Sequence, residues 1–466
     1  MSDTEPDNPA ATDGADTAPE APRKPSMSRL SEVLFASGTI GNGLLPGFLV
    51  SWQMVYFAPP SDSTRPLLVA ATVIGWVNLI GQIVHSLADW AIGYLSDRTR
   101  TRWGRRIPWI VISSPIYTVA FVVLWWPPAT VLGWQNVVWL AGIRAIMWIA
   151  YTASVGPYCS LLPEVTEPGE ERTRVGGFMA VFEVLGTVLS TLVAGHMIDA
   201  HKDGGTLFGW HLTDGFKYTA AVLSLVSLVS MWISIAVIRE KPHSAAKEVP
   251  YGPVQSLVTT LQNPAFAWYA LAFIAFRIGL NAIITVMPYQ TEVILHLDDP
   301  DSAAGNLQGV IVLGSIPFFL VINSLVKRVG KRRVMLWGFL GFAVVISAGA
   351  LIGKLPFGSP VMQAYLIYAL SAFPVATLFM LPRPIMADII DLDAERTGYR
   401  REGIYNGAEG LLTKFAEGMG PFVAAQLLDH LGRSSANPLG VILTAPISGG
   451  ICLLGWLLFL KYPIHD

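Results

Sequence analysis

The chain has 466 residues, of which 52% are hydrophobic and only 14% are charged. Soluble domains usually carry about 25% charged residues, so this composition excludes an ordinary soluble enzyme. The net charge of −2 gives no indication of a nucleic-acid partner. The two cysteines, Cys159 and Cys452, lie in separate apolar stretches and give neither a disulfide framework nor a metal-ligand pattern. We therefore expect an integral membrane protein, not an enzyme, with no metal site and no cofactor beyond a coupling ion.

The N-terminal segment differs from the rest of the chain. Its first 25 residues contain six acidic residues and five prolines but almost no large apolar side chains. Such a segment cannot bury enough apolar surface to offset the entropy of ordering. It also lacks the apolar stretch of a signal peptide. We predict that residues 1–28 form a disordered cytoplasmic tail.

Long apolar segments follow along the remaining chain. A membrane-spanning helix needs about 20 apolar residues to cross about 30 Å of hydrocarbon, and segments of this length exclude the short alternating strands of a barrel. The pattern predicts an all-α integral membrane protein with 12 transmembrane helices. We place them near residues 30–56, 67–95, 107–126, 134–161, 175–199, 216–238, 264–296, 305–326, 334–354, 360–387, 403–430 and 438–461.

The distribution of basic residues predicts the orientation. With the N-terminus inside, 22 of the 31 Lys and Arg residues fall on the cytoplasmic side. The positive-inside rule therefore favours a multi-pass protein of a bacterial inner membrane with both termini in the cytoplasm. We expect an N-terminal six-helix half over 29–238, a cytoplasmic linker over 239–263 and a C-terminal six-helix half over 264–466.

Two basic loops indicate an internal repeat. Gly104-Arg105-Arg106 follows the second predicted span and Gly330-Lys331-Arg332 follows the eighth, 226 residues later. The loops after spans four and ten are also alike, since both are rich in acidic residues and arginine. Two six-helix halves related by a parallel repeat are the organisation of the major facilitator superfamily, with the substrate site at the midplane between them.

Three stretches carry a more specific resemblance. The stretch 89–109 (DWAIGYLSDRTRTRWGRRIPW), the stretch 158–166 followed by Arg172, and the stretches 386–391 and 397–403 are similar to loops of one family. This family is the glycoside-pentoside-hexuronide:cation symporters, which are melibiose permease-like members of the major facilitator superfamily. The resemblance covers most of the chain in corresponding order.

The resemblance implies a cation-coupling site. The family's carboxylate on span two corresponds to Asp89, its threonine on span four to Thr152 and its lysine on span eleven to Lys414, but His85 replaces the family's first carboxylate. The polar positions that contact galactosides in the family are also replaced. They fall on Gly43, Val155, Cys159 and Ala180.

The same residues stand out on physical grounds. His85 and Asp89 are four residues apart and share a helix face. An aspartate inside hydrocarbon needs a partner or a watery cavity, and Lys414 from the other half is the natural partner. A purely structural ion pair is the alternative. Further ionisable or polar residues inside spans are candidates for the substrate cavity, unless they extend to the membrane interface. They are Asn42, Arg144, Glu183, Arg277, Glu409 and Glu417.

The charged loops predict a cytoplasmic gate. Salt bridges between helices at this side would close it and break when it opens, as the rocking of two halves requires. Charge that only follows the membrane topology is the alternative interpretation. The candidate gate residues are Asp97, Arg98, Arg102, Arg105, Arg106, Asp388, Asp391, Arg400 and Arg401.

The coupling ion follows from the histidine. Sodium prefers oxygen ligands, whereas a proton needs one titratable group, and an unperturbed imidazole titrates near neutrality. We therefore favour H+ carried by Asp89 with help from His85, with Na+ bound at Asp89 and Thr152 as the alternative.

The predicted function is cation-coupled symport of a small solute by alternating access. A glycoside, sugar or sugar acid is the favoured substrate of what we expect to be a monomer in contact with membrane lipid. An amphipathic lipid or steroid-like substrate is the alternative among transporters, because vertebrate lysolipid transporters resemble the same family. A membrane solute sensor that does not transport is the alternative from another class.

Overall fold

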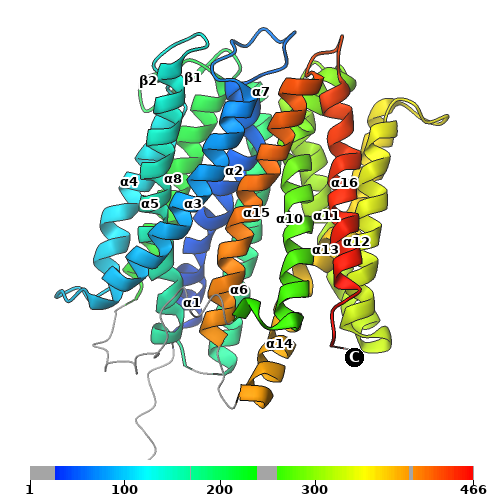
Figure 1. Ribbon diagram of the computed structural model, residues 1–466. Coiled ribbons are helices and arrows are strands. Elements are labelled where there is room, and N and C mark those ends of the chain that lie inside the picture. Colours follow the sequence, from blue (N-terminus) through cyan, green and yellow to red (C-terminus); the bar gives the residue numbers. More distant parts are fainter. Residues whose placement is uncertain (1–26, 168, 239–259, 398–401, 465–466) are drawn as a thin grey trace, which may run out of the picture.

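The computed structural model describes residues 27–167, 169–238, 260–397 and 402–464, which fold into a bundle of long helices (Figure 1). The predicted tail and linker lie mostly outside these residues. The first half contains α1 (Arg29–Ala36), α2 (Ile40–Phe57), α3 (Ala71–Arg98), α4 (Ile107–Leu124), α5 (Trp134–Val165), α6 (Glu170–Val188), α7 (Ala194–Ala200) and α8 (Gly215–Ala236), with a hairpin of β1 (Gly205–Leu207) and β2 (Trp210–Leu212). The second half contains α10 (Pro264–Tyr289), α11 (Pro300–Val329), α12 (Lys331–Ser347), α13 (Pro360–Met380), α14 (Pro382–Thr397), α15 (Glu402–Leu431) and α16 (Leu439–Phe459).

Several spans contain a local departure from the α-helix. The first span joins α1 to α2 through a 3-10 turn at Ser37–Thr39, and the fifth joins α6 to α7 through a π-helical segment at Leu189–Val193. The predicted span 360–387 consists of α13 and α14, which meet around Leu381 just before Pro382. Proline removes a backbone donor and disfavours the helical conformation of the residue before it, which explains this break.

The prediction of a twelve-helix membrane protein is confirmed. Within the described residues, 11 helical segments are long and apolar enough to cross a membrane. The twelfth is α15, which has 30 residues but is more polar, because it carries Glu402, Glu409, Lys414, Glu417 and Asp429. Charged side chains within a membrane helix are costly unless they face the bundle interior, so α15 is the helix expected to face a polar centre.

The halves lie side by side and meet along α3 and α15, with α2 against α10 and α7 against α11 (Figure 1). Small residues bring α3 and α15 together. A Cβ atom at Gly418 would lie 3.0 Å from the Cα of Leu79, and one at Gly75 would lie 3.2 Å from the Cα of Phe422. Such close approach is the usual means of packing helices where both partners are in lipid.

We name the two ends of the bundle by their features. The hairpin end carries β1 and β2 together with the loop 58–70, and lies at the top of Figure 1. The basic end carries the loop 99–106, the segment 327–333 where α11 ends and α12 begins, and the last residues of α16.

Candidate functional site

An ion pair joins the halves at the centre of the α3–α15 contact. Asp89 on α3 accepts a hydrogen bond from the ammonium of Lys414 on α15 and a second one, of 2.8 Å, from the hydroxyl of Thr152 on α5. Nε2 of His85, one turn earlier on α3, lies 3.8 Å from the Asp89 carboxylate. The four residues assigned to cation coupling from sequence therefore lie together.

His85 itself is held by its surroundings. Its ring stacks on Trp148 with the centroids 4.3 Å apart and meets the edge of Tyr151. Its Nδ1 lies 3.1 Å from the amide oxygen of Gln82. The side chain is buried. These contacts fix the ring so that one nitrogen is directed to Gln82 and the other to Asp89.

A cavity of about 570 Å³ extends from this ion pair toward the basic end, between α3, α5 and α15. Polar groups make up much of its wall, including the Asp89 and Lys414 side chains. Further residues of the wall are His85, Ser96, Tyr151, Thr152, Ser160, Asn406, Glu409, Thr413 and Glu417. The volume lies in the range of small-molecule sites.

The six cavity candidates separate into two groups. Glu409 and Glu417 line the cavity; Glu409 accepts a hydrogen bond of 2.5 Å from Tyr269, and Glu417 pairs with Arg277 at 2.8 Å. The others do not line it. Asn42 lies in a narrow crevice near Cys159, Glu183 is exposed on α6, and Arg144 is buried among α2, α3 and α5.

The position that falls on Gly43 has a steric explanation. A Cβ atom there would lie only 2.3 Å from the carbonyl oxygen of Glu183. The close packing of α2 on α6 therefore leaves no room for the aspartate that the family carries at this position.

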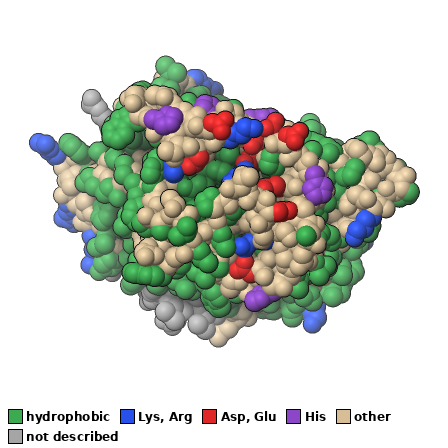
Figure 2. All heavy atoms as spheres, turned by 90° about the horizontal axis from the view of Figure 1, so that it is seen from above, with side chains coloured by type: hydrophobic (Ala, Val, Ile, Leu, Met, Phe, Trp, Pro, Cys, Tyr) green, Lys and Arg blue, Asp and Glu red, His purple; other side chains and the backbone are tan. Residues whose placement is uncertain are grey.

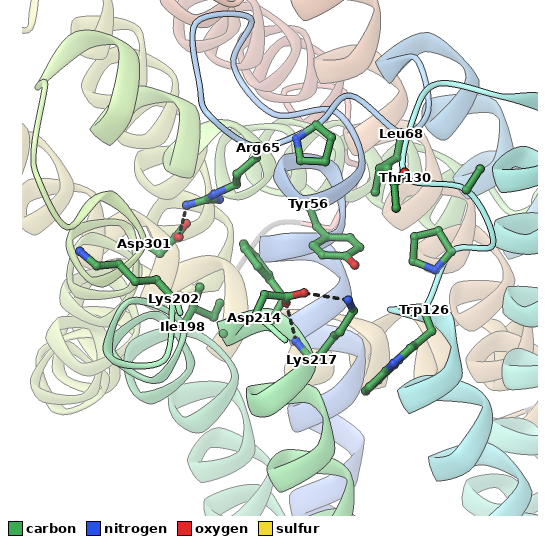
Figure 3. Close-up of a pocket in the computed structure, with 15 residues that line it drawn as sticks. Tyr56, Arg65, Leu68, Trp126, Thr130, Ile198, Lys202, Asp214, Lys217 and Asp301 are labelled. Carbon is green, nitrogen blue, oxygen red and sulfur yellow. Dashed lines mark hydrogen bonds and ion pairs between the residues drawn. The ribbon is translucent and has the colours of Figure 1, made fainter. Parts of the chain in front are cut away.

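The hairpin end is closed by contacts between the halves. Arg65, in the loop after α2, pairs with Asp301 at the start of α11 at 2.5 Å (Figure 3). The Arg65 guanidinium also lies 5.0 Å from the centre of the Phe216 ring. Burial disfavours the charged form of Arg65, but the neighbouring carboxylates of Asp301 and Glu292 outweigh it and raise the Arg65 pKa. A pocket of about 260 Å³ beside this pair is lined by aromatic side chains, among them Tyr56 and Trp126.

Backbone groups extend this closure across the same end. Asp199 accepts from the backbone amide of Ser302 at 2.5 Å, Asp429 from that of Thr72 at 2.6 Å and Asp62 from that of Ser435 at 2.8 Å. The Ser435 side chain, and to a lesser extent this backbone bond, lower the pKa of Asp62. Viewed from this end, acidic and basic side chains lie next to one another near the middle of the face (Figure 2).

At the basic end, the ion pairs with described partners stay within one half. Arg105 and Arg106 both pair with Glu164 at the end of α5, and Lys331 pairs with Asp388. Arg98 lies over the ring of Tyr94, and Arg102 lies near Trp103. Asp391 is exposed at this end. The side chain of Asp97, and Arg400 and Arg401, lie outside the described residues.

Comparison with known proteins gives the same architecture. Residues 63–464 match the model of the family described as MFS/sugar transport protein. The chain belongs to this family. The resemblance drawn from the loop motifs is therefore confirmed, and the fold is that of a major facilitator transporter. The crystal structure of D-xylose-proton symporter is similar with a TM-score of 0.65 at 15% identity, over 93% of this chain and 97% of that one.

Curated members of the family differ in what their names say they carry. The isoprimeverose transporter of Lactiplantibacillus pentosus is 25% identical over 82% of this chain and 77% of its own length. The sodium-dependent lysophosphatidylcholine symporter 1 of Xenopus tropicalis is 23% identical over 83% of this chain and 79% of its own length. The family is thus one of transporters, and its curated members are named for different substrates.

Sequence reasoning missed the uncharged residues around the site. Gln82 lies three residues before His85, so helical spacing places it on the same face, but amides inside spans carry no strong signal of their own. Trp148 and Tyr151 pack on His85, but in the sequence they cannot be distinguished from other aromatic residues of a membrane span. The Arg65–Asp301 pair joins a loop to the first turn of α11 over 236 residues, which no local pattern could connect.

Proposed function

We propose that this protein is a proton-coupled symporter of a small polar solute, a sugar, glycoside or sugar acid, and that it works by alternating access. The observation that carries the proposal is the contact of Lys414 and Thr152 with Asp89 on the wall of the cavity between the halves. A single carboxylate there both binds the opposite half and faces the solute space, so its charge can link ion binding to conformation.

The donor set favours a proton over sodium. Around Asp89, the described side chains supply one carboxylate, one hydroxyl and an imidazole, and the Lys414 ammonium already occupies one carboxylate oxygen. Sodium prefers several oxygen ligands, and a nearby ammonium repels it. A proton needs only the carboxylate. We assign the transferable proton to Asp89.

His85 then has a positioning role. A positive charge on its ring would lie near two other cations, Lys414 and Arg144. Stacked on Trp148 and directed toward Gln82, the neutral ring instead orients the carboxylate of Asp89. This refines the sequence-based hypothesis that Asp89 carries the proton with help from His85.

The cavity wall supports a polar solute over a lipid. Hydroxyl, amide and carboxylate groups on α3, α5 and α15 can meet sugar hydroxyls, and the volume accommodates one or two sugar rings. An acyl chain would instead need a continuous apolar channel.

We assign the basic end to the cytoplasm of a bacterial inner membrane from the positive-inside rule. The structure then corresponds to an inward-facing state. We propose that the charged loops of the basic end, which pair within each half here, form pairs across the halves when the hairpin end opens.

Uptake into proteoliposomes tests the proposal. In sodium-free buffer, an imposed inward proton gradient should drive accumulation of a transported sugar, and a sodium gradient without a proton gradient should not. The variant His85→Asp is compared with the wild-type protein in the same assay. It places a second carboxylate next to Asp89 and should therefore make uptake depend on sodium. Uptake that requires sodium and ignores the proton gradient would contradict proton coupling. Binding without counterflow would instead indicate a sensor.

A further inference from the structure

A polar cluster is sealed inside the first half, closer to the hairpin end than Asp89. Arg144 on α5 donates to the amide oxygen of Gln53 on α2. Its guanidinium lies 5.6 Å from the centre of the Trp148 ring, which also stacks on His85. Only 4% of Arg144 is exposed. The cluster therefore continues the cation-coupling site toward the hairpin end, through His85.

The charge of Arg144 is not balanced within the cluster. By contrast, Arg277 within α10 and the loop residues Arg65 and Arg433 each pair with a carboxylate, at 2.8, 2.5 and 2.5 Å. Arg144 makes no ion pair with any described residue. Arginine keeps its charge in proteins, and a buried charge without a counterion is costly. A cation maintained at this cost points to an anion that occupies the site in another state.

Further hydrogen-bonding atoms of this cluster lack partners, and so does Asn78, which lies one turn before Gly81 on α3, where a Cβ atom would lie 3.1 Å from Nε of Arg144. They are buried, with no hydrogen-bond partner in the described structure: Nε of Arg144, Nε2 of Gln53, Nε1 of Trp148 and Oδ1 of Asn78. Buried polar atoms in native proteins are almost always paired. Three of these four are N–H donors, which is the set that an anionic oxygen group would satisfy.

The second half covers this cluster. A Cβ atom on Gly418 of α15 would lie 3.1 Å from Cγ of Gln82 and 3.3 Å from the backbone oxygen of Asn78. On the α2 side, Thr285 of α10 donates to the backbone oxygen of Val50, one turn before Gln53. Separation of α3 from α15 at the hairpin end would uncover the cluster, while the present cavity lies on the other side of the ion pair.

We propose that Arg144, with Gln53, Asn78 and Trp148, binds the carboxylate of a sugar acid when the hairpin end is open. The planar guanidinium binds a carboxylate through two parallel hydrogen bonds, and the amides meet the neighbouring hydroxyls. A neutral sugar would leave the cation unpaired, so the site selects the acid. This proposal rests on the proposed function, because it names the substrate class of the same transporter.

Matched ligand pairs test it with full-length protein in nanodiscs. D-glucuronate and D-glucose, and D-galacturonate and D-galactose, differ only in whether C6 is a carboxylate or a hydroxymethyl group. We expect at least one acid to bind about tenfold or more tightly than its neutral partner, the effect of one charged hydrogen bond. Arg144→Gln should abolish this difference and Arg144→Lys should retain part of it. The exposed Lys354, in the loop before α13, gives the control Lys354→Gln, which should preserve the difference.

Three results would overturn the proposal. They are the absence of binding of both acids, equal or tighter binding of the neutral sugars, and an equal loss for acid and sugar in Arg144→Gln. Should Arg144→Gln fail to fold, Gln53→Leu removes only the amide that orients the guanidinium, and the acid preference should still fall several-fold. Proton-driven uptake of a neutral sugar that survives Arg144→Gln would overturn this inference but leave the proposed function standing.

Discussion

The two ends of the bundle hold their helices by different means. At the hairpin end, a charge pair and backbone hydrogen bonds cross from one half to the other, and Asp301 at their centre is almost fully buried. At the basic end, the described ion pairs remain within each half, and the cavity separates α3 and α5 from α15. Of the contacts at the two ends, among the described residues, those that hold the two halves together are therefore at the hairpin end. A transition to the other state must break the crossing contacts first.

The largest effect is expected at the ion pair where the closed and open regions meet. Asp89→Asn and Lys414→Ala should each abolish accumulation of substrate against its gradient, while exchange of substrate between equal concentrations persists. Each change removes the charge that links the proton to the halves. The Asp89 side chain is 47% exposed, so its loss should affect stability less than the loss of a fully buried pair. Uptake by reconstituted protein measures this, and accumulation equal to wild type in either variant would contradict the assignment.

The next effect concerns the closure itself. Arg65→Ala leaves the buried carboxylate of Asp301 without its partner, at a cost of about 1.5–3 kcal/mol to the closed hairpin end. The ratio of open to closed hairpin ends should rise about ten- to hundredfold. Reaction of a cysteine placed at Gln308, buried at this interface, with a membrane-impermeant reagent measures the change. Lys202→Ala, which removes an exposed cation of the same end, should leave the labelling rate unchanged.

A larger side chain at the contact between α7 and α11 should open the hairpin end less than the loss of Arg65. A Cβ atom at Gly195 on α7 would lie 2.3 Å from the backbone oxygen of Asp301 on α11. Overpacking of this kind costs about 1–3 kcal/mol, and less where the helices can shift apart. Gly195→Ala should therefore favour the open hairpin end in the same labelling assay. Gly450 on α16 has no atom within 4 Å of such a Cβ, so Gly450→Ala is the matched control. Equal labelling in both variants would argue against a tight α7–α11 seal.

The smallest effect is expected from pH at the surface of the hairpin end. Hydrogen bonds from Ser435, first from its side chain and then from its backbone amide, lower the pKa of Asp62. This contact therefore stabilises the closed end above the usual aspartate range and weakens as pH falls through the lowered value. Spin-label distances across the hairpin end, measured from pH 6 to pH 3, should increase slightly more in wild type than in Asp62→Asn. Because the side chain is exposed, a large change that depends on Asp62 would mean that the seal has been misjudged.

The sequence predicted the helices, and it predicted that Asp89 and Lys414 would lie together. The length of the apolar segments identifies the membrane-spanning helices. An aspartate within hydrocarbon requires a partner such as Lys414. The hairpin-end seal could not be predicted in this way. Arg65 and Asp301 resemble ordinary loop residues, and only the tertiary fold brings them together. The same holds for Arg144, which was expected in the cavity but is covered by α2, α3 and α5 in this state, because one sequence must serve two arrangements of the halves.

Distances across both ends of one molecule test the central account most directly. In a background without Cys159 and Cys452, spin labels at Thr130 and Ala436 report on the hairpin end, and labels at Thr173 and Lys327 report on the basic end. Dipolar spectroscopy in nanodiscs without substrate should give a short, narrow distribution at the hairpin end and a broad, longer one at the basic end. Arg65→Ala should broaden the first and shorten the second. Two results would contradict this account. One is a wild-type protein that is open at the hairpin end and closed at the basic end. The other is an Arg65→Ala variant in which the distances change at one end alone.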